Sequence, residues 1–202
     1  MIRAINLTGT SPIVRIPTNE PIWFDQALDS GAHGVMVPMI SDEESAHQAV
    51  VSARYPPSGR RSIGGYRAQF AFNVDRSEYL SQASEVVEVW LQIEDWRAVE
   101  NASAIAAVGG VTGLFVGPQD LAASLGLEPS LEPTAPAFQD ALDHLLRVAQ
   151  HSGVPLGILV PDVPSAERRI SQGFRIVAVS TDARILATGG AALMPTRTIT
   201  SN

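Results

Sequence analysis

Two carboxylates each follow an apolar run that is typical of a buried strand. Glu94 comes directly after the run Val86 to Ile93, and Asp120 lies shortly after the run Gly113 to Val116. Ligands gather at the carboxyl ends of parallel strands in alternating strand–helix proteins, so these acids are placed to share a divalent cation and face a substrate. Their oxygens favour magnesium, manganese or a similar ion. The alternative for each acid alone is a helix N-cap or an ion-pair partner.

Short, β-rich apolar runs alternate with helical patterns along the whole chain. The runs 12–16, 34–38, 86–93, 113–116, 156–160 and 176–179 predict buried parallel strands. The stretches 23–29, 42–53, 96–108, 137–151, 165–172 and 183–193 predict helices between them. A closed barrel of such units needs eight and typically about 250 residues. We therefore expect a single α/β domain over residues 1–202, a TIM-barrel-like fold with about six of eight units. Arg3 to Asn6 reads as the tail of a helix, as if the first two units were missing.

Two stretches are too irregular for simple connections. Tyr55 to Arg67 is long and rich in Gly and Pro, and we expect it to form a working loop at the mouth of the site. Its arginines could recognise an acidic substrate, although exposed arginines are more often simply solvated: Arg60, Arg61 and Arg67. Leu127 to Pro136, with three prolines, is the second irregular stretch.

Composition excludes several classes of chemistry. All 14 basic residues are arginine, so no lysine can form a Schiff base or serve a P-loop, and carbonyl activation would have to be metal-based. Cysteine is absent, which excludes disulfides and thiolate chemistry. A net charge of −7 without a basic cluster argues against nucleic acid as a partner. No signal peptide or membrane span is apparent, so we expect a cytoplasmic protein without a membrane partner.

A series of motifs, taken in order, resembles the HpcH/HpaI family of class II pyruvate aldolases over nearly the whole chain. The motifs are Val14-Arg15-Ile16-Pro17, Leu28-Asp29-Ser30-Gly31-Ala32, Val37-Pro38-Met39, Arg54-Tyr55-Pro56-Pro57, Gln92-Ile93-Glu94 and Gly117-Pro118-Gln119-Asp120-Leu121. The resemblance implies a TIM barrel of the phosphoenolpyruvate/pyruvate type and a homo-oligomer. It implies a lyase that cleaves 4-hydroxy-2-oxo acids to pyruvate, or a relative of it, and an aldehyde.

The resemblance also assigns roles to residues. The family's metal ligands fall on Glu94 and Asp120, and the ion would be magnesium, manganese or cobalt. A cation chelated by the pyruvyl carboxylate and ketone polarises the carbonyl and stabilises the enolate left by carbon–carbon cleavage. Arg15 would act in catalysis by holding the oxyanion or the substrate carboxylate, and its alternative is an ion pair with a neighbouring acid.

Further residues are expected to bind the substrate. Gln92 lies two residues before Glu94, on the same strand face, and could position the substrate or a metal-bound water, or be an interior polar residue. Backbone groups around Gly117 and Pro118 could receive a carboxylate at a helix N-terminus, a weak signal by itself.

One departure concerns the family's catalytic histidine, which lies in an Asp-Gly-Glu-His segment that has no counterpart here. The partner carboxylate of its dyad maps onto Asp29, a second expected catalytic residue. The four histidines present are expected to be structural or surface residues: His33, His47, His144 and His151. Acid–base groups contribute about 100- to 10,000-fold to rate, so aldol cleavage should suffer more than oxaloacetate decarboxylation or pyruvate enolisation.

Two other functions stay open. One is a non-catalytic or truncated relative that binds a metal and a 2-oxo acid, or a protein partner. The other is an acyl-CoA lyase of the citrate-lyase type. Six units would also leave two sheet edges uncovered, which a longer chain, a rearranged closure or self-association could cover. The polar tail 194–202 argues against exchange of the last helix between subunits.

Overall fold

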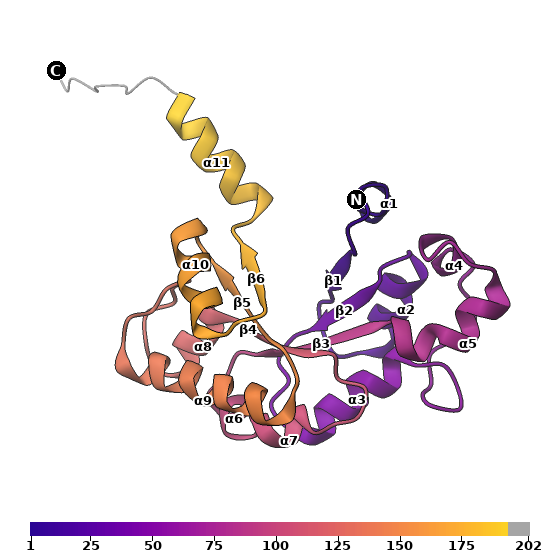
Figure 1. Ribbon diagram of the computed structural model, residues 1–202, viewed down its shortest axis with the longest axis horizontal. Helices are drawn as coiled ribbons and strands as arrows, with labels where there is room; N and C mark the ends of the chain where they lie inside the picture. Colours follow the sequence, from indigo (N-terminus) through magenta and orange to yellow (C-terminus); the bar gives the residue numbers. More distant parts are fainter. Residues whose placement is uncertain (194–202) are drawn as a thin grey trace.

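The computed structural model describes residues 1–193 and contains one curled sheet of six parallel strands (Figure 1). The strands occur in the sheet in their order along the chain. They are β1 (Ile13–Arg15), β2 (Gly34–Val37), β3 (Glu88–Ile93), β4 (Gly113–Val116), β5 (Leu156–Val160) and β6 (Ile176–Val179). Each of the six apolar runs contains one strand, so the prediction of a TIM-barrel-like fold with six units is confirmed.

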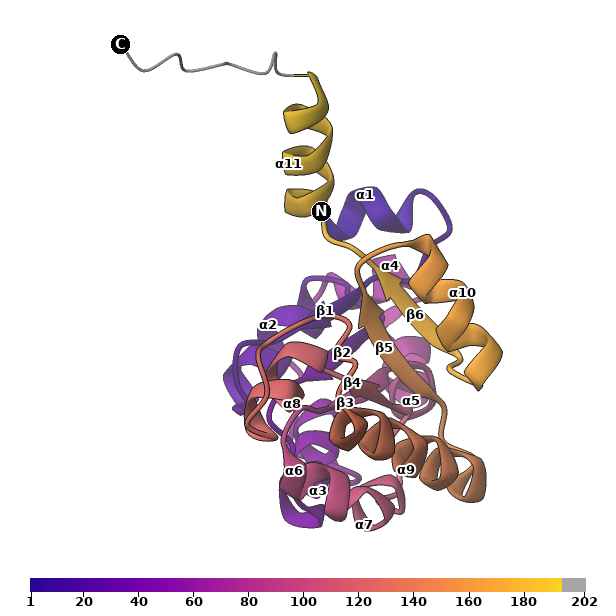
Figure 2. The same cartoon turned by 90° about the vertical axis from the view of Figure 1, so that its left-hand side faces the viewer.

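The helices that connect the strands lie on the outer face of the curled sheet, whereas the first helix precedes β1 and the last follows β6 (Figures 1 and 2). The helices are α1 (Ile2–Asn6), α2 (Pro21–Asp29), α3 (Glu43–Ala53), α4 (Ala68–Ala71), α5 (Arg76–Val86), α6 (Trp96–Glu100), α7 (Ala102–Ala106), α8 (Pro118–Ser124), α9 (Pro136–Ser152), α10 (Val163–Gln172) and α11 (Asp182–Leu193). Because neighbouring strands are parallel, each connection returns the chain to the edge where strands begin. We call that the N-terminal edge, and the opposite one the C-terminal edge.

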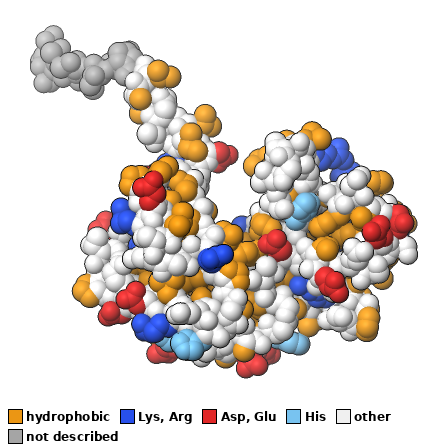
Figure 3. Space-filling model, viewed as in Figure 1, with side chains coloured by type: hydrophobic (Ala, Val, Ile, Leu, Met, Phe, Trp, Pro, Cys, Tyr) orange, Lys and Arg blue, Asp and Glu red, His pale blue; other side chains and the backbone are white. Residues whose placement is uncertain are grey.

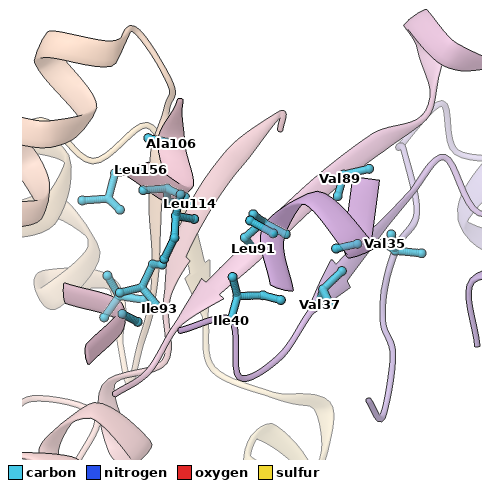
Figure 4. Close-up of a cluster of buried hydrophobic side chains, with 14 of the residues drawn as sticks. Val35, Val37, Ile40, Val89, Leu91, Ile93, Ala106, Leu114 and Leu156 are labelled. Carbon is cyan, nitrogen blue, oxygen red and sulfur yellow. The ribbon is translucent and has the colours of Figure 1, made fainter. Parts of the chain in front are cut away.

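The hydrophobic core lies between the sheet and its helices, and Figure 4 shows its centre. The strand side chains on this face are essentially inaccessible to solvent: Val35, Val37, Val89, Leu91, Ile93, Leu114, Val116, Leu156, Ile158 and Val160. Full burial of one such side chain contributes roughly 1.5–3 kcal/mol, so the central strands form a rigid base for residues at their ends.

The other face of the sheet is concave, and large side chains there pack over glycines. A Cβ atom on Gly113 would lie 2.1 Å from the ring of Trp90, and one on Gly157 would lie 2.6 Å from the ring of Phe115. Register places Gly113 opposite Trp90 and Gly157 opposite Phe115. The glycines therefore make room for two aromatic rings on this face. Figure 3 shows the molecule hollowed on one side, with hydrophobic side chains along the hollow.

Local sequence signals account for several helix ends, but the sequence prediction missed two features of the helices. Asp42 forms a capping box with Ser45 at the start of α3. The helix expected over residues 96–108 is divided at Asn101 into α6 and α7. Helix α5 was not predicted, and its last turn takes the first residue of the apolar run assigned to β3.

One side of the sheet is open. Strands β1 and β6 are the end strands, and within residues 1–193 neither pairs with a second neighbour. Helix α11 projects away from the sheet, with Ile185, Leu186 and Leu193 more than half exposed (Figures 1 and 2). The tail 194–202, used above as an argument about helix exchange, lies outside the described residues. Within the described part of the chain, no helix has the length and hydropathy needed to cross a membrane.

Candidate active site

Glu94 is the first residue after β3 and lies at the C-terminal edge of the sheet. It is only 3% exposed. The backbone N–H of Met39, two residues beyond β2, donates a hydrogen bond of 2.8 Å to its Oε1 atom. Burying an ionised carboxylate to this degree costs free energy unless hydrogen bonds or opposite charges stabilise it. Here the Met39 N–H is a single donor, and it contacts only one of the two carboxylate oxygens.

The surroundings of Glu94 favour a cation. Burial raises the pKa of Glu94 above its ordinary 4.5, the Met39 N–H opposes that rise, and the nearby Asp120 carboxylate adds to it. Arg15 lowers this pKa and Asp95 raises it, both with smaller effects. A divalent cation between Glu94 and Asp120 would remove both the burial penalty and the repulsion.

Asp120 comes from the next unit. It lies in the first turn of α8, where acidic side chains are stabilised by the helix dipole, and it is exposed. No set of three or more His, Asp or Glu side chains suited to a metal occurs within residues 1–193. A cation here would thus take two carboxylates from the protein and complete its shell with water or substrate oxygens, as magnesium usually does.

Gly117 and Pro118 join β4 to α8. The Gly117 N–H donates to the carbonyl of Ile93 at 3.2 Å, which holds this turn against the end of β3. A Cβ atom at Gly117 would lie 2.5 Å from Oε2 of Glu94. Only glycine therefore lets the backbone pass so close to the carboxylate. Pro118 is buried as the first residue of α8.

Arg15 and Gln92 complete the group. Arg15 is exposed at the end of β1, and its Nε donates to Oε1 of Gln92 at 3.1 Å. Within residues 1–193, Arg15 forms no ion pair, so the ion-pair alternative is not supported by the structure. Because Gln92 accepts from Nε, the terminal nitrogens of the guanidinium are left to meet an anion.

The predicted residues therefore separate into two places. Arg15, Gln92, Glu94, Gly117, Pro118 and Asp120 meet at the C-terminal edge. Asp29 ends α2 at the N-terminal edge, where its Oδ1 accepts a hydrogen bond of 2.7 Å from Arg61. The catalytic role of Asp29 stays a prediction of the resemblance, and its contact here is structural.

The loop expectation was wrong in two respects. The segment 55–67 follows α3, not a strand, and so lies at the N-terminal edge, away from the two acids. Arg54 fixes its start by donating to the carbonyls of Val87 at 2.6 Å and Gly110 at 3.1 Å. Arg61 is not solvated: its side chain is 0% exposed. It lies 4.5 Å from the Tyr55 ring and donates to the Tyr79 hydroxyl at 3.1 Å.

Asp29 should therefore matter for stability. We expect Asp29→Asn to lower the free energy of unfolding by about 2–3 kcal/mol, because it leaves the buried Arg61 guanidinium without its charge partner. Urea unfolding at pH 7 measures this. If stability were unchanged while catalytic activity fell, the catalytic role implied by the resemblance would be favoured instead.

Asp25→Asn is the matched control, one turn earlier on α2. Burial raises the pKa of Asp25 above 3.8, the Ser62 backbone hydrogen bond opposes this, and Asp29 adds to it. The folded state thus favours neutral Asp25, and this stabilisation is present below pH 3.8 and lost as pH rises through the raised pKa. At pH 7, Asp25→Asn should leave the free energy of unfolding unchanged or raise it. In acid, where Asp25 is already neutral, the substitution should not raise the free energy of unfolding.

Two residues that position this site were not identified in advance. Met39 acts through its backbone N–H, which a sequence motif does not reveal, although it stands in the quoted Val37-Pro38-Met39. Ser41 donates through its hydroxyl to Asp95, joining the loop after β2 to the loop after β3. Both contacts depend on two loops meeting at the same edge.

Known proteins resemble this chain over most of its length. The sequence model of the HpcH/HpaI aldolase/citrate lyase family matches residues 1–188. The 5-keto-4-deoxy-D-glucarate aldolase of Shigella dysenteriae is 38% identical over 182 residues, which are 90% of this chain and 70% of that protein.

Solved structures agree. An HpcH/HpaI aldolase/citrate lyase family protein from Burkholderia cenocepacia superposes with a TM-score of 0.86 at 36% identity, covering 95% of this chain and 76% of that one. An HpcH/HpaI aldolase from Desulfitobacterium hafniense gives 0.84 at 27% identity, covering 96% and 77%. The chain belongs to the HpcH/HpaI aldolase/citrate lyase family.

Proposed function

We propose that this protein is a divalent-cation-dependent lyase that cleaves a 4-hydroxy-2-oxo acid to pyruvate and an aldehyde. The observation that carries the proposal is a buried carboxylate, Glu94, held beside Asp120 with a guanidinium facing the same hollow. Membership of an aldolase/lyase family supports the reaction class. The relatives at 38% identity are aldolases, which favours this reaction over acyl-CoA cleavage.

The substrate class follows from chemistry and from these relatives. Their substrate, 5-keto-4-deoxy-D-glucarate, has a hydroxyl two carbons from its ketone, so numbering from the keto end makes it a 4-hydroxy-2-oxo acid. It also has a carboxylate at each end. We assign this chain to acidic, sugar-derived substrates of that kind, with the aldehyde product carrying the second carboxylate.

Each residue then has a task. Glu94 and Asp120 would hold the cation, which polarises the substrate ketone and stabilises negative charge on its oxygen. Arg15 binds the substrate carboxylate or the developing oxyanion through the nitrogens that Gln92 leaves free. Gly117 keeps the backbone close to Glu94 without displacing its carboxylate.

The site as proposed does not include a group assigned to proton transfer with the substrate. Asp29, which the resemblance places in the catalytic dyad, pairs with Arg61 at the other edge, away from Glu94 and Asp120. Aldol cleavage needs proton transfer at the 4-hydroxyl, whereas loss of carbon dioxide from oxaloacetate does not need a base. We therefore place oxaloacetate decarboxylation above aldol cleavage in expected rate.

The test is Mn²⁺-dependent pyruvate release from a racemic 4-hydroxy-2-oxo acid and from oxaloacetate, with EDTA as the control. We expect both reactions to require Mn²⁺ and the second to be faster. Release that persists in EDTA would contradict cation dependence. If neither substrate reacts while Mn²⁺ still binds, the binding-protein alternative would replace the enzyme.

The assembly is part of the proposal. We place residues 1–202 in one barrel-type domain whose open side, between β1 and β6, is covered in the working protein. Helix α11 has no buried residue, and its exposed Ile185, Leu186 and Leu193 suit contact with another subunit. We therefore assign a homo-oligomer, which light scattering of the purified protein measures directly.

A further inference from the structure

Met39 has a backbone conformation that L-residues seldom adopt. Its φ is +55°, in the left-handed region, although it is not glycine. Packing of the side chain does not account for this, because the residue is 61% exposed. A strained residue persists only where surrounding contacts determine its conformation, and such residues cluster at functional sites.

Contacts on both sides of Met39 fix the loop after β2. Asn101 donates through Nδ2 to the Ser41 carbonyl at 2.8 Å, and the Ser41 hydroxyl donates to the carboxylate of Asp95. Asp95 is itself fixed, because its other oxygen caps α6 by accepting from the N–H of Ala98 at 2.7 Å. The loop is therefore tied to the end of β3 independently of Met39.

The left-handed conformation of Met39 directs its backbone N–H to one oxygen of Glu94. The Met39 N–H contacts Oε1 of Glu94 at 2.8 Å, whereas Oε2 lies on the side of Gly117, where a Cβ would be 2.5 Å away. One oxygen is thus engaged by the backbone and the other is left for a ligand. A carboxylate with a fixed rotamer loses little freedom when it binds a cation.

We propose that Met39 is a positioning residue whose strained backbone N–H orients Glu94 so that Oε2 alone is presented to the cation. This rests on the proposed function, because it takes Glu94 to be a cation ligand. The side chain of Met39 has no part in the role, so tolerance of positive φ decides which residues can replace it.

A substitution series at Met39 separates backbone conformation from side-chain chemistry. Gly and Asn accept positive φ, whereas Val, being β-branched, resists it. We expect Met39→Gly and Met39→Asn to bind Mn²⁺ within about threefold of wild type and Met39→Val to bind at least about tenfold more weakly. If the apolar side chain mattered, Val would be the best substitute and Asn the worst. Mn²⁺ affinity is read from the electron paramagnetic resonance signal of the free ion.

Asn73→Val is the matched control, because Asn73 has φ +54° in the turn between α4 and α5. It should reduce thermal stability as Met39→Val does and leave Mn²⁺ affinity unchanged. Retained affinity in folded Met39→Val would overturn the proposal, as would equal loss in Met39→Asn.

Amide hydrogen exchange gives a readout without metal. In the metal-free protein, Glu94→Ala should speed exchange at the Met39 amide at least about tenfold, because it removes the acceptor. Unchanged exchange would refute the hydrogen bond on which the role depends. If exchange responds but wild-type protein binds no Mn²⁺, the cation site of the proposed function fails, and the role of Met39 fails with it.

Discussion

Replacing Glu94 with Gln is expected to reduce Mn²⁺ affinity and Mn²⁺-dependent pyruvate release by at least about 100-fold, equal to about 2.7 kcal/mol. Gln has the same shape, and its carbonyl oxygen can still accept from the Met39 N–H at the position of Oε1. Its amide nitrogen would replace Oε2, and an amide N–H₂ does not bind a divalent cation. The change therefore removes a ligand while keeping the geometry.

The fold should survive this substitution. Burial raises the pKa of Glu94, which means that the ionised form is penalised in the metal-free folded state. A neutral Gln should leave thermal stability in EDTA unchanged or higher. Glu88→Gln is the matched control: it lies on the same strand at the opposite edge, where its carboxylate accepts from Trp90 Nε1 at 2.6 Å. Undiminished Mn²⁺-dependent turnover in Glu94→Gln would refute the assigned site.

The second large effect is expected from a single methyl group, in Gly117→Ala. The added Cβ would lie 2.5 Å from Oε2 of Glu94, closer than such atoms approach in proteins, and 3.0 Å from Cβ of Glu94, which is tighter than most real contacts. The backbone at Gly117 has φ −93° and ψ 92°, which alanine adopts without strain, so the effect is purely steric. We expect the carboxylate to be displaced, with Mn²⁺ affinity lowered at least about tenfold and stability lowered by about 1–3 kcal/mol.

Gly109→Ala serves as the control for Gly117→Ala. A Cβ at Gly109 meets nothing within 4 Å, so the same substitution there should change neither affinity nor stability noticeably. Titration with Mn²⁺ and thermal unfolding of both variants decide the matter. Wild-type affinity in Gly117→Ala would show that Glu94 Oε2 is not confined as the structure indicates.

Apolar runs and the helical patterns between them were enough to predict the layered architecture. Outward-facing strand residues such as Val35 and Leu114 must be buried by helices, and that requirement is visible as a continuous apolar run in the sequence. The prediction failed where a run belonged to two elements: Val86 ends α5, and β3 begins only at Glu88. Periodicity cannot separate a helix end from a strand start within so few residues.

The loop 55–67 shows a different failure. Its length and its glycines and prolines suggested a functional loop, but those features do not say at which edge it lies. The order of elements decides that, because a loop after a helix meets the N-terminal edge. The burial of Arg61 was also invisible, since it depends on Asp29 and two tyrosines from separate segments.

The sequence by itself determined the strand–helix units and predicted the chemistry that is proposed for the site. Continuous apolar runs, the absence of lysine, and acids after successive strands predicted a parallel α/β protein with a carboxylate cation site. Only the tertiary structure decided how those acids are held. Met39 comes from the connection after β2, Gly117 and Asp120 come from the connection after β4, and all three meet Glu94 where parallel strands end together. Local propensity acts over a few residues, whereas the environment of a buried carboxylate is set by contacts between units far apart in the chain.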